Sequence, residues 1–271
     1  MLLVLVIHIP ERGLYLKWQK LEPCKSIFFH DGYNLAREYL ADGLSKDRLT
    51  MLMTAAYEAI DGLIISFRNR CLREGLHIDC AQGCSWCCHQ AVLVSTQEVL
   101  LISRYLSREM AEEQQQVVCR NAREKEAVTG DMSVREFLQY LHPCPFLLDH
   151  SCLIYPVRPM ACRCYLSSDV DSCLAQYNQS GNRQIMASLY DFPLRAGRLI
   201  NEGIRAVLMQ NRVITSEWLL EVLISKTMAH PGIFDEWLSG EDPFTIRALS
   251  ADENEYLREY RHRQESFNDG D

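Results

Sequence analysis

Cysteine is the residue type in this sequence whose number and spacing can do chemistry. Four cysteines fall within the nine residues from Cys80 to Cys88, in the pattern C-x3-C-x2-C-C. Ten of the twelve cysteines lie between residues 80 and 173. Cys119 stands apart from the others, and the second group is Cys144, Cys152, Cys162, Cys164 and Cys173. Cysteine thiolates are strong ligands for zinc and for iron–sulfur clusters. The clustering therefore predicts a thiolate-bound metal site, but it does not choose the metal.

The spacing within the first group suits chelation, because ligands two to four residues apart on a turn can reach one metal. Gly83 gives the backbone of this segment room to curl. The adjacent pair Cys87 and Cys88 points in different directions on a strand or a helix, so both rarely bind one tetrahedral metal. Two arrangements follow: two four-ligand sites that share loops, or one cluster plus a zinc.

Charged and histidine side chains near the cysteines are further candidates. Four thiolates on Zn²⁺ leave a net charge of about −2, which nearby cations should offset. Arg158 and Arg163 lie within the second group and could supply this charge. Four histidines lie within three residues of a clustered cysteine, and any of them could replace a cysteine as a ligand: His77, His89, His142 and His150.

Composition limits the class of protein. The formal net charge of the 271 residues is −8, which argues against a general nucleic-acid binder. Hydrophobic residues make up 48% of the chain, as expected for a globular protein and not for a disordered one. We find no run of eighteen apolar residues, so we expect no transmembrane helix.

The apolar start of the chain, Met1 to Ile9, makes a poor signal peptide because no basic residue precedes it. A buried strand or a misplaced start codon explains it better. We therefore predict a cytoplasmic protein. In that reducing compartment clustered cysteines are more often metal ligands or redox groups than structural disulfides.

Helical patterns dominate the rest of the sequence. A long amphipathic helix is expected from about Asp47, with Gly75 as its stop and Cys71 on its apolar stripe. Residues 91–94 read as a short buried strand. Capping boxes at 95–98, 133–136 and 250–253 predict helix starts, and a polar helix carrying a packed Cys119 should follow the first. Two amphipathic helical runs are expected later, at 199–208 and 218–223.

Irregular structure is expected in three places. Residues 10–33 read as turns and short pieces, and Cys24 there receives no role. Prolines on both sides place Cys144 on a rigid turn within a loop-rich stretch from 143 to 173. The polar end, residues 264–271, should be frayed.

The fold class that follows is mostly α, a compact helical domain with an irregular, loop-rich cysteine module. We divide the chain into residues 1–79, 80–175 and 176–271, and we expect all three to share one compact domain. Regular alternation of strands and helices is absent, so a parallel α/β sheet is not expected. The sequence also contains no G-x-G, H-E-x-x-H or G-x-S-x-G motif, which leaves nothing to indicate a nucleotide fold, a zinc protease or a serine hydrolase.

Three motifs in order carry a family resemblance. They are C-x3-C-x2-C-C at 80–88, then Cys144-Pro145-Phe146-Leu147, then the segment from Cys152 to Arg163 that contains Ile154-Tyr155 and Arg158-Pro159. Together they resemble the YkgJ-type cysteine-cluster family, a family of zinc- or iron-chelating domains. The resemblance covers roughly residues 80–175. It implies these ligands: Cys80, Cys84, Cys87, Cys88, Cys144, Cys152, Cys162 and Cys173. Cys164 is extra to the pattern.

Three functions remain open on this basis. The first is a metal-binding protein with an iron–sulfur cluster, favoured over zinc, in electron transfer, redox sensing or metal handling. The second is an S-adenosylmethionine-dependent enzyme. Cys80-x3-Cys84-x2-Cys87 resembles the radical S-adenosylmethionine motif, and flagellin lysine N-methylase resembles the cysteine-cluster family. The third is a zinc-stapled interaction module. A protein partner or substrate is compatible with all three, and the residues identify none.

Overall fold

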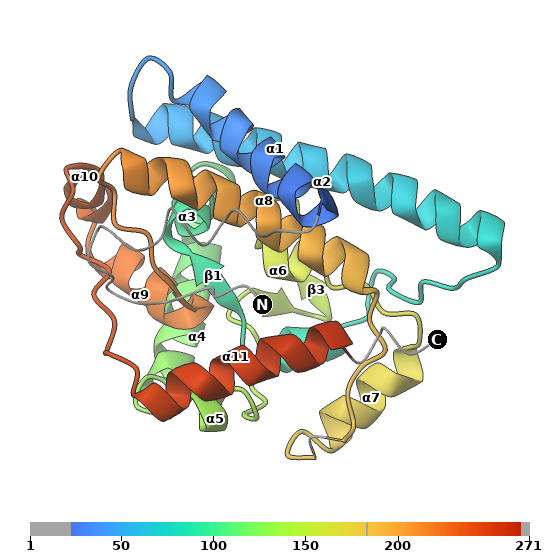
Figure 1. Cartoon of the computed structure of the whole chain (residues 1–271). Helices are drawn as coiled ribbons and strands as arrows, with labels where there is room; N and C mark the ends of the chain where they lie inside the picture. Colours follow the sequence, from blue (N-terminus) through green and yellow to red (C-terminus); the bar gives the residue numbers. More distant parts are fainter. Residues whose placement is uncertain (1–22, 183, 267–271) are drawn as a thin grey trace.

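Three long helices form one side of the computed structural model, which describes residues 23–182 and 184–266. They are α1 (Pro23–Tyr39), α2 (Lys46–Glu74) and α8 (Asp191–Gln210), and they pack along one another (Figure 1). Helices α1 and α8 cross closely at two glycines. A Cβ atom on Gly32 or on Gly203 would lie 2.1 Å from a backbone oxygen of the other helix. Gly32 therefore serves helix packing.

Helix α1 corrects the expectation of turns over residues 10–33, which is wrong from Pro23 onward. Proline is favoured in the first turn of a helix, where its missing N–H costs no hydrogen bond. A glycine such as Gly32 suggests a turn in the sequence, because the sequence does not reveal that a second helix will cross at this position. The expectations for Met1–Ile9 and for residues 10–22 lie outside the described residues, as does the side chain of Cys24.

Helix α2 forms as the sequence predicts. The Ser45 side chain accepts a hydrogen bond from the backbone N–H of Arg48 at 3.2 Å, and Gly75 ends the helix with a φ of 73°. Cys71 is buried on the predicted apolar stripe. By length and composition α2 is also a candidate membrane span among the described residues. Its inner face packs into the core, which accounts for much of that apolar character, and a single such helix is weak evidence for a membrane.

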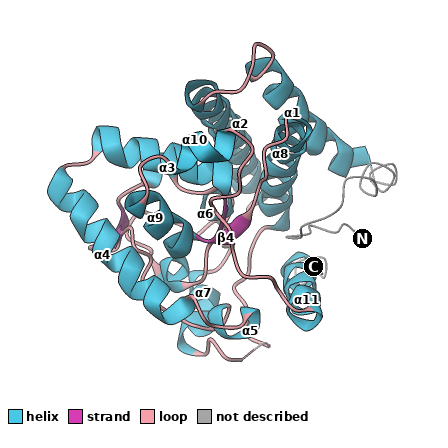
Figure 2. Cartoon of the chain, turned by 90° about the vertical axis from the view of Figure 1, so that its left-hand side faces the viewer, coloured by secondary structure: helices cyan, strands magenta, loops and turns pink. Residues whose placement is uncertain are grey.

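The second layer of the core contains α3 (Thr96–Glu109), α4 (Glu112–Thr129) and α9 (Leu220–Ala229), which lie on the opposite side of α8 (Figures 1 and 2). Strand β1 (Leu93–Ser95) leads directly into α3, and β4 (Glu217–Leu219) leads into α9. The two strands pair antiparallel, with Val94 opposite Trp218.

This pairing corrects one expected helix. Trp218 and Leu219 lie in a strand, and α9 begins only at Leu220. The helical spacing of residues 218–223 is real, but β1 supplies hydrogen-bond partners from more than one hundred residues away. The short strand expected at 91–94 is present as β1, which starts two residues later and ends one residue later than expected.

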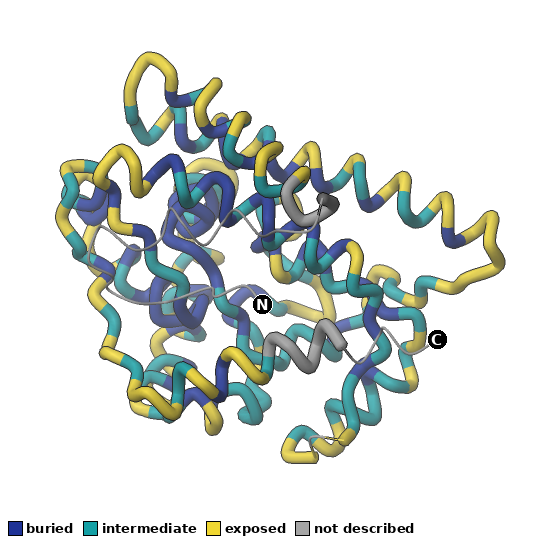
Figure 3. Tube along the Cα trace, in the orientation of Figure 1, coloured by how far each residue is buried: buried dark blue, intermediate teal, exposed yellow. Residues whose placement is uncertain are grey.

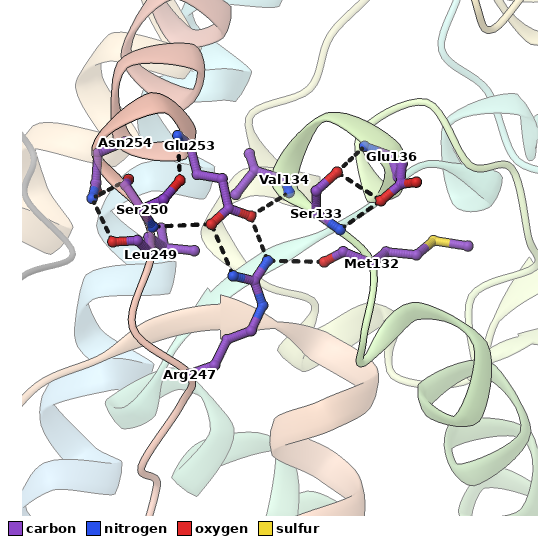
Figure 4. A network of polar contacts seen from close by, with 9 residues as sticks. All are labelled: Met132, Ser133, Val134, Glu136, Arg247, Leu249, Ser250, Glu253 and Asn254. Carbon is purple, nitrogen blue, oxygen red and sulfur yellow. Dashed lines mark hydrogen bonds and ion pairs between the residues drawn. The ribbon is translucent and has the colours of Figure 1, made fainter.

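All three predicted capping boxes are present, at α3, α5 (Val134–Phe137) and α11 (Ala251–Ser266). The last two are joined by one polar network (Figure 4). Glu253 accepts from the Val134 N–H at 3.1 Å and from both terminal nitrogens of Arg247, which also donates to the Met132 carbonyl. These bonds lower the pKa of Glu253 to about 2, Arg247 having the largest effect. Helix α11 is thus fixed beside α5, and it extends to Ser266. The rest of the end that was expected to fray, residues 267–271, lies outside the described residues.

The cysteine-rich region is the irregular part of the molecule, as predicted. The two segments that carry the clustered cysteines, residues 79–90 and 143–178, hold only short elements, although α3 and α4 lie between them: η2 (Trp86–His89), β2 (Leu147–Leu148), β3 (Ser151–Cys152), η3 (Tyr155–Val157), α6 (Met160–Arg163) and α7 (Val170–Asn178). A small helix, α10 (Ile233–Leu238), completes the other end of the fold. Buried residues concentrate where α3, α8 and α9 meet, while α1 and α2 expose their outer faces (Figure 3). The described residues confirm a mostly α, compact fold with few short strands.

Candidate metal centre

The first cysteine motif adopts a turn followed by a short 3-10 helix. Gly83 has a φ of 89°, a backbone conformation that side chains with a Cβ disfavour. The N–H of Cys84 donates to the Ala81 carbonyl at 3.1 Å, and that of Cys88 donates to the Ser85 carbonyl at 3.0 Å. The chain therefore curls tightly between Cys80 and Cys88, as the spacing of the cysteines requires.

The second cysteine group is presented by a turn, a small hairpin and a one-turn helix. Cys144 begins a turn closed by the Leu147 N–H, which donates to its carbonyl at 2.9 Å. Cys152 lies on β3 directly opposite Leu147 of β2. Cys162 lies on α6. The predicted rigid turn at Cys144 is confirmed.

Backbone hydrogen bonds join the two groups. The Cys144 N–H donates to the Cys88 carbonyl at 2.7 Å, and the His142 N–H donates to the His89 carbonyl at 2.9 Å. At the other end of the motif, the Ser167 N–H donates to the Cys80 sulfur at 3.2 Å. Segments more than fifty residues apart in sequence are thus tied together at both ends of the first motif.

Electrostatic interactions divide the eight predicted ligands into two sets. We call the first the Cys88 set: Cys88, Cys144, Cys152 and Cys162. Burial raises the pKa of Cys144 to about 12 and raises that of Cys162 well above the usual value, and neighbouring thiols of the same set add to both shifts. Burial also raises the pKa of Cys152, to which Cys88 again contributes.

The remaining four form the Cys80 set: Cys80, Cys84, Cys87 and Cys173. Burial raises the pKa values of Cys80 and Cys173, with Cys84 adding to both shifts. Cys87 lies where the two sets meet, because its thiol hydrogen bonds to Cys88 and also interacts with Cys162 and Cys80. That hydrogen bond is the main reason that the pKa of Cys88 is lowered. Cys87 therefore interacts with members of both sets, and its assignment to the Cys80 set stays a prediction.

Backbone N–H groups already point at three of these sulfurs. Phe146 donates to Cys144, Ile154 to Cys152 and Ser167 to Cys80, and each bond opposes the effect of burial on the pKa. Hydrogen bonds of this kind stabilise a thiolate over a thiol. A buried set of thiols with such donors fits a metal centre better than it fits an apolar core.

The eleven cysteines whose side chains are described are all free thiols. Among the described residues, no three Cys, His, Asp or Glu side chains already converge tightly enough to hold a single metal ion. Binding therefore requires thiol side chains to turn toward a common centre. Such ordering is usual where metal binding is coupled to local folding.

Cations lie beside both ends of the Cys88 set. The charge of Arg158 lowers the pKa of Cys152. The charge of Arg163 lowers the pKa of Cys164, which does not belong to the set. The sequence reading missed Lys125, which is 2% exposed and lowers the pKa values of Cys88 and Cys144. A signal was present: in the polar sequence of α4, Lys125 falls on the same helical stripe as the buried Val118 and Ala122.

Glu98 positions the helix that carries Cys162. Its carboxylate is 2% exposed and accepts five hydrogen bonds. One comes from the Met160 N–H at the start of α6, at 2.6 Å, and another from the Tyr57 hydroxyl at 3.0 Å. The sequence identified Glu98 only as half of a capping box. Its contacts with α2, α6 and α8 come from tertiary packing.

Arg163 fixes the other end of α6. It is buried, forms an ion pair with Asp61, donates to the Pro156 carbonyl at 2.6 Å and lies over the Tyr57 ring at 4.3 Å. Its charge is paired with Asp61, and among the cysteines it lowers the pKa of Cys164, which is not one of the predicted ligands. Its expected role in offsetting the charge of bound thiolates stays a prediction.

The other cysteines pack in the interior or on helix faces. The Cys164 sulfur lies against Gly197 of α8, only 2.4 Å from where a Cβ would sit, and belongs to the core. Cys71 is buried and Cys119 half-buried. Of the four histidines, His89 and His150 place a ring nitrogen 3.0 Å from the backbone or side chain of Ser85, and His142 contacts the Pro143 carbonyl. His77 offers its carbonyl to Tyr190.

A cavity of about 1150 Å³ lies beside the cysteines within the described part of the fold. All the ligands predicted from the sequence except Cys173 line it. The lining also contains polar side chains of two helices: Arg198 and Asn201 of α8, and Gln97 and Glu98 of α3. A small molecule could therefore reach the cysteines through this cavity.

Comparison with known proteins supports the chemistry of these residues. Residues 79–181 match the model of a family named CxxCxxCC, whose description is "Putative zinc- or iron-chelating domain". The match spans both cysteine groups and α7. It confirms the cysteine-cluster resemblance and carries no YkgJ-type name. No curated protein and no solved structure matches the chain.

Proposed function

We propose that this chain, in which residues 79–181 form a domain of the zinc- or iron-chelating family, binds metal through two sets of four cysteine thiolates. The observation that supports the proposal is that Cys88, Cys144, Cys152 and Cys162 interact electrostatically with one another, while Cys80, Cys84 and Cys173 interact among themselves. Eight thiols in two groups exceed what a single metal ion needs.

Iron–sulfur chemistry is favoured over zinc by the spread of the thiols. In a cluster each thiolate binds its own iron, whereas the four ligands of one zinc must meet at a single point. The thiols of each set interact electrostatically without converging on one point. A cluster would supply one-electron redox chemistry, and the chain would hold it, limit its contact with water and set its charge. We therefore propose a role in electron transfer or redox sensing.

The proposed setting is the cytoplasm, where free thiols persist. The described cysteines carry no disulfide, in keeping with that compartment. We expect the partner to be a protein or a small molecule and not a nucleic acid, since the net charge is −8.

The test is anaerobic purification followed by an absorption spectrum and metal analysis of the same sample. We expect a brown protein with several irons per chain. Cys84→Ser should remove the metal of the Cys80 set alone, Cys144→Ser that of the Cys88 set alone, and the double variant both. Cys164→Ser and Cys119→Ser are matched controls that should retain the full metal content.

Two results would overturn parts of this proposal. Unchanged metal content in the double variant would show that these thiols are not the ligands. A colourless, air-stable protein with stoichiometric zinc would replace iron–sulfur chemistry with a zinc-stapled interaction module.

A second candidate, an S-adenosylmethionine-dependent enzyme, is favoured by one observation. Cys80, Cys84 and Cys87 line the cavity, whereas Cys173 does not, so a cofactor in the cavity could approach this three-cysteine motif. The helical fold of the described residues lacks the repeated strand–helix units of a barrel. Anaerobic titration with S-adenosylmethionine decides the matter, since absence of binding to the metal-loaded protein excludes this candidate.

A further inference from the structure

Lys125 is a lysine buried in the wall behind the cysteines. Its side chain is 3% exposed and comes from α4, and it does not line the cavity. Its ammonium group donates to the His142 carbonyl at 3.3 Å. Its counter-charge is Glu221 of α9, 1% exposed, with a nitrogen–oxygen distance of 3.8 Å.

This buried pair is incompletely satisfied. The Glu221 oxygen nearest Lys125 has no hydrogen-bond partner, while the other accepts from the Thr129 hydroxyl at 2.9 Å. An ammonium has three donors, and the ion pair here is longer than a hydrogen bond. Burying two charges in this way costs more than a well-packed apolar pair of the same size. Stability alone therefore does not explain why a lysine occupies this position.

The Cys88 set lies next to this ammonium group. The His142 carbonyl belongs to the segment that leads to Cys144, and the Cys144 N–H is bonded to the Cys88 carbonyl at 2.7 Å. The positive charge also lowers the pKa values of both thiols. Lys125 thus holds the segment that presents one ligand and carries a positive charge beside two.

We propose that Lys125 is the positioning and charge-compensating residue of the Cys88 set, increasing its affinity for a metal that would otherwise leave excess negative charge in the interior. The negative charge of Glu221 offsets part of the positive charge of Lys125 and so limits its effect on the affinity. The inference rests on the proposed function, because it requires that these four thiols bind metal.

The test measures Zn²⁺ binding to the metal-free protein by competition with a chromogenic chelator, in a Cys84→Ser background where only the Cys88 set is complete. Lys125→Gln removes the charge and retains a hydrogen-bond donor for His142. Lys125→Met removes both. We expect both variants to bind Zn²⁺ about 10- to 100-fold more weakly, the range found when groups supporting metal ligands are removed. Lys125→Met should show the larger loss.

Three controls separate charge from general damage. Glu221→Gln should change the affinity in the opposite direction, because it leaves the positive charge less balanced. Lys125→Gln in a Cys152→Ser background should leave the affinity of the Cys80 set unchanged. Arg158→Gln removes a cation that is only half-buried and should have a smaller effect than Lys125→Gln, because solvent screens more of its charge. Circular dichroism of each metal-free variant checks that the helices are retained.

The outcomes distinguish this inference from the proposed function. If Cys84→Ser protein binds no Zn²⁺ and also carries no iron after anaerobic purification, the proposed function fails for this set. If it carries iron but binds no Zn²⁺, the Lys125 variants are compared by their iron content. If it binds Zn²⁺ and Lys125→Gln binds equally well, the proposed function stands and the charge role of Lys125 is overturned. A loss in Lys125→Gln accompanied by an equal loss in Glu221→Gln would likewise overturn it, because the effect would then be structural.

Discussion

The two cysteine sets are neighbours, but different kinds of structural element present them. The Cys88 set is presented by elements fastened to the helical core: α6 is held by Glu98 and Arg163, and a buried lysine lies behind the set. The Cys80 set comes from one surface turn with Gly83 at its tip, closed by Cys173 at the start of α7. Cys87 and Cys88 are adjacent in sequence, yet the Cys88 set has core-anchored supports and a buried cation, whereas the Cys80 set depends on a surface turn.

The largest expected effect is that of pH on metal affinity. Burial raises the pKa values of most thiols in both sets, among them Cys80, Cys144 and Cys162, so these thiols keep their protons until a metal displaces them. Binding to a complete set should release up to about four protons, and affinity should therefore rise steeply with pH. In Cys84→Ser protein the rise should continue beyond pH 9, since the pKa of Cys144 is about 12. A pH-independent affinity would contradict thiolate ligation.

Removing Glu98 should damage the Cys88 set and the fold together. Glu98→Ala leaves the Met160 and Ser95 N–H groups and the Tyr57 hydroxyl without their partner. We expect a loss of about 3–5 kcal/mol in the free energy of unfolding, measured by urea denaturation. Glu109→Ala at the exposed end of the same helix is the control and should change stability by less than about 0.5 kcal/mol. Equal effects of the two would contradict the role of Glu98.

The two sets should differ in how readily they lose metal. A chelator reaches the Cys80 set through the surface turn, whereas two members of the Cys88 set are tied to the core-anchored hairpin and α6. We expect metal to leave Cys144→Ser protein about 10- to 100-fold faster than Cys84→Ser protein, measured by stopped-flow chelation. The reverse order would overturn the comparison.

Gly83→Ala tests the surface turn alone. A Cβ meets no other atom within 4 Å there, but the φ of 89° should make the substitution cost roughly 1–2 kcal/mol. The Cys80 set should therefore bind metal about 5- to 30-fold more weakly, while the Cys88 set is unaffected. Gly62→Ala, in the interior of α2 with open space around it, is the matched control and should stabilise the protein by roughly 0.5–1 kcal/mol.

The smallest effect is expected at α11, remote from both sets. The folded-state pKa of Glu253 is lowered to about 2, so its contribution is present above the usual glutamate pKa and is lost as pH falls toward 2. Glu253→Gln should reduce stability at pH 7 and make no difference at pH 2. Metal affinity of either set should stay unchanged, and a change would mean that α11 supports the metal centre directly.

Much of the fold could be predicted from local patterns. The stripe and caps of α2, the three capping boxes and the loop at Cys144 depend on neighbours within a few residues, and the structure has them where the sequence indicated. The errors share one cause. Gly32 and Trp218 are explained by partners far along the chain, Ile200 in the first case and Val94 in the second. Spacing rules contain no information about such partners.

The sequence by itself determined the chemistry: eight thiols in family-like motifs and a tight turn at Gly83. Only the tertiary structure decided which thiols are neighbours, since the β2–β3 hairpin, α6 and α7 bring residues 144–173 to opposite ends of the first motif. It also decided which charges act on them. Lys125 and Glu98 look like ordinary helix residues in sequence. They matter because packing removes them from water, and charge interactions in the protein interior are only weakly screened.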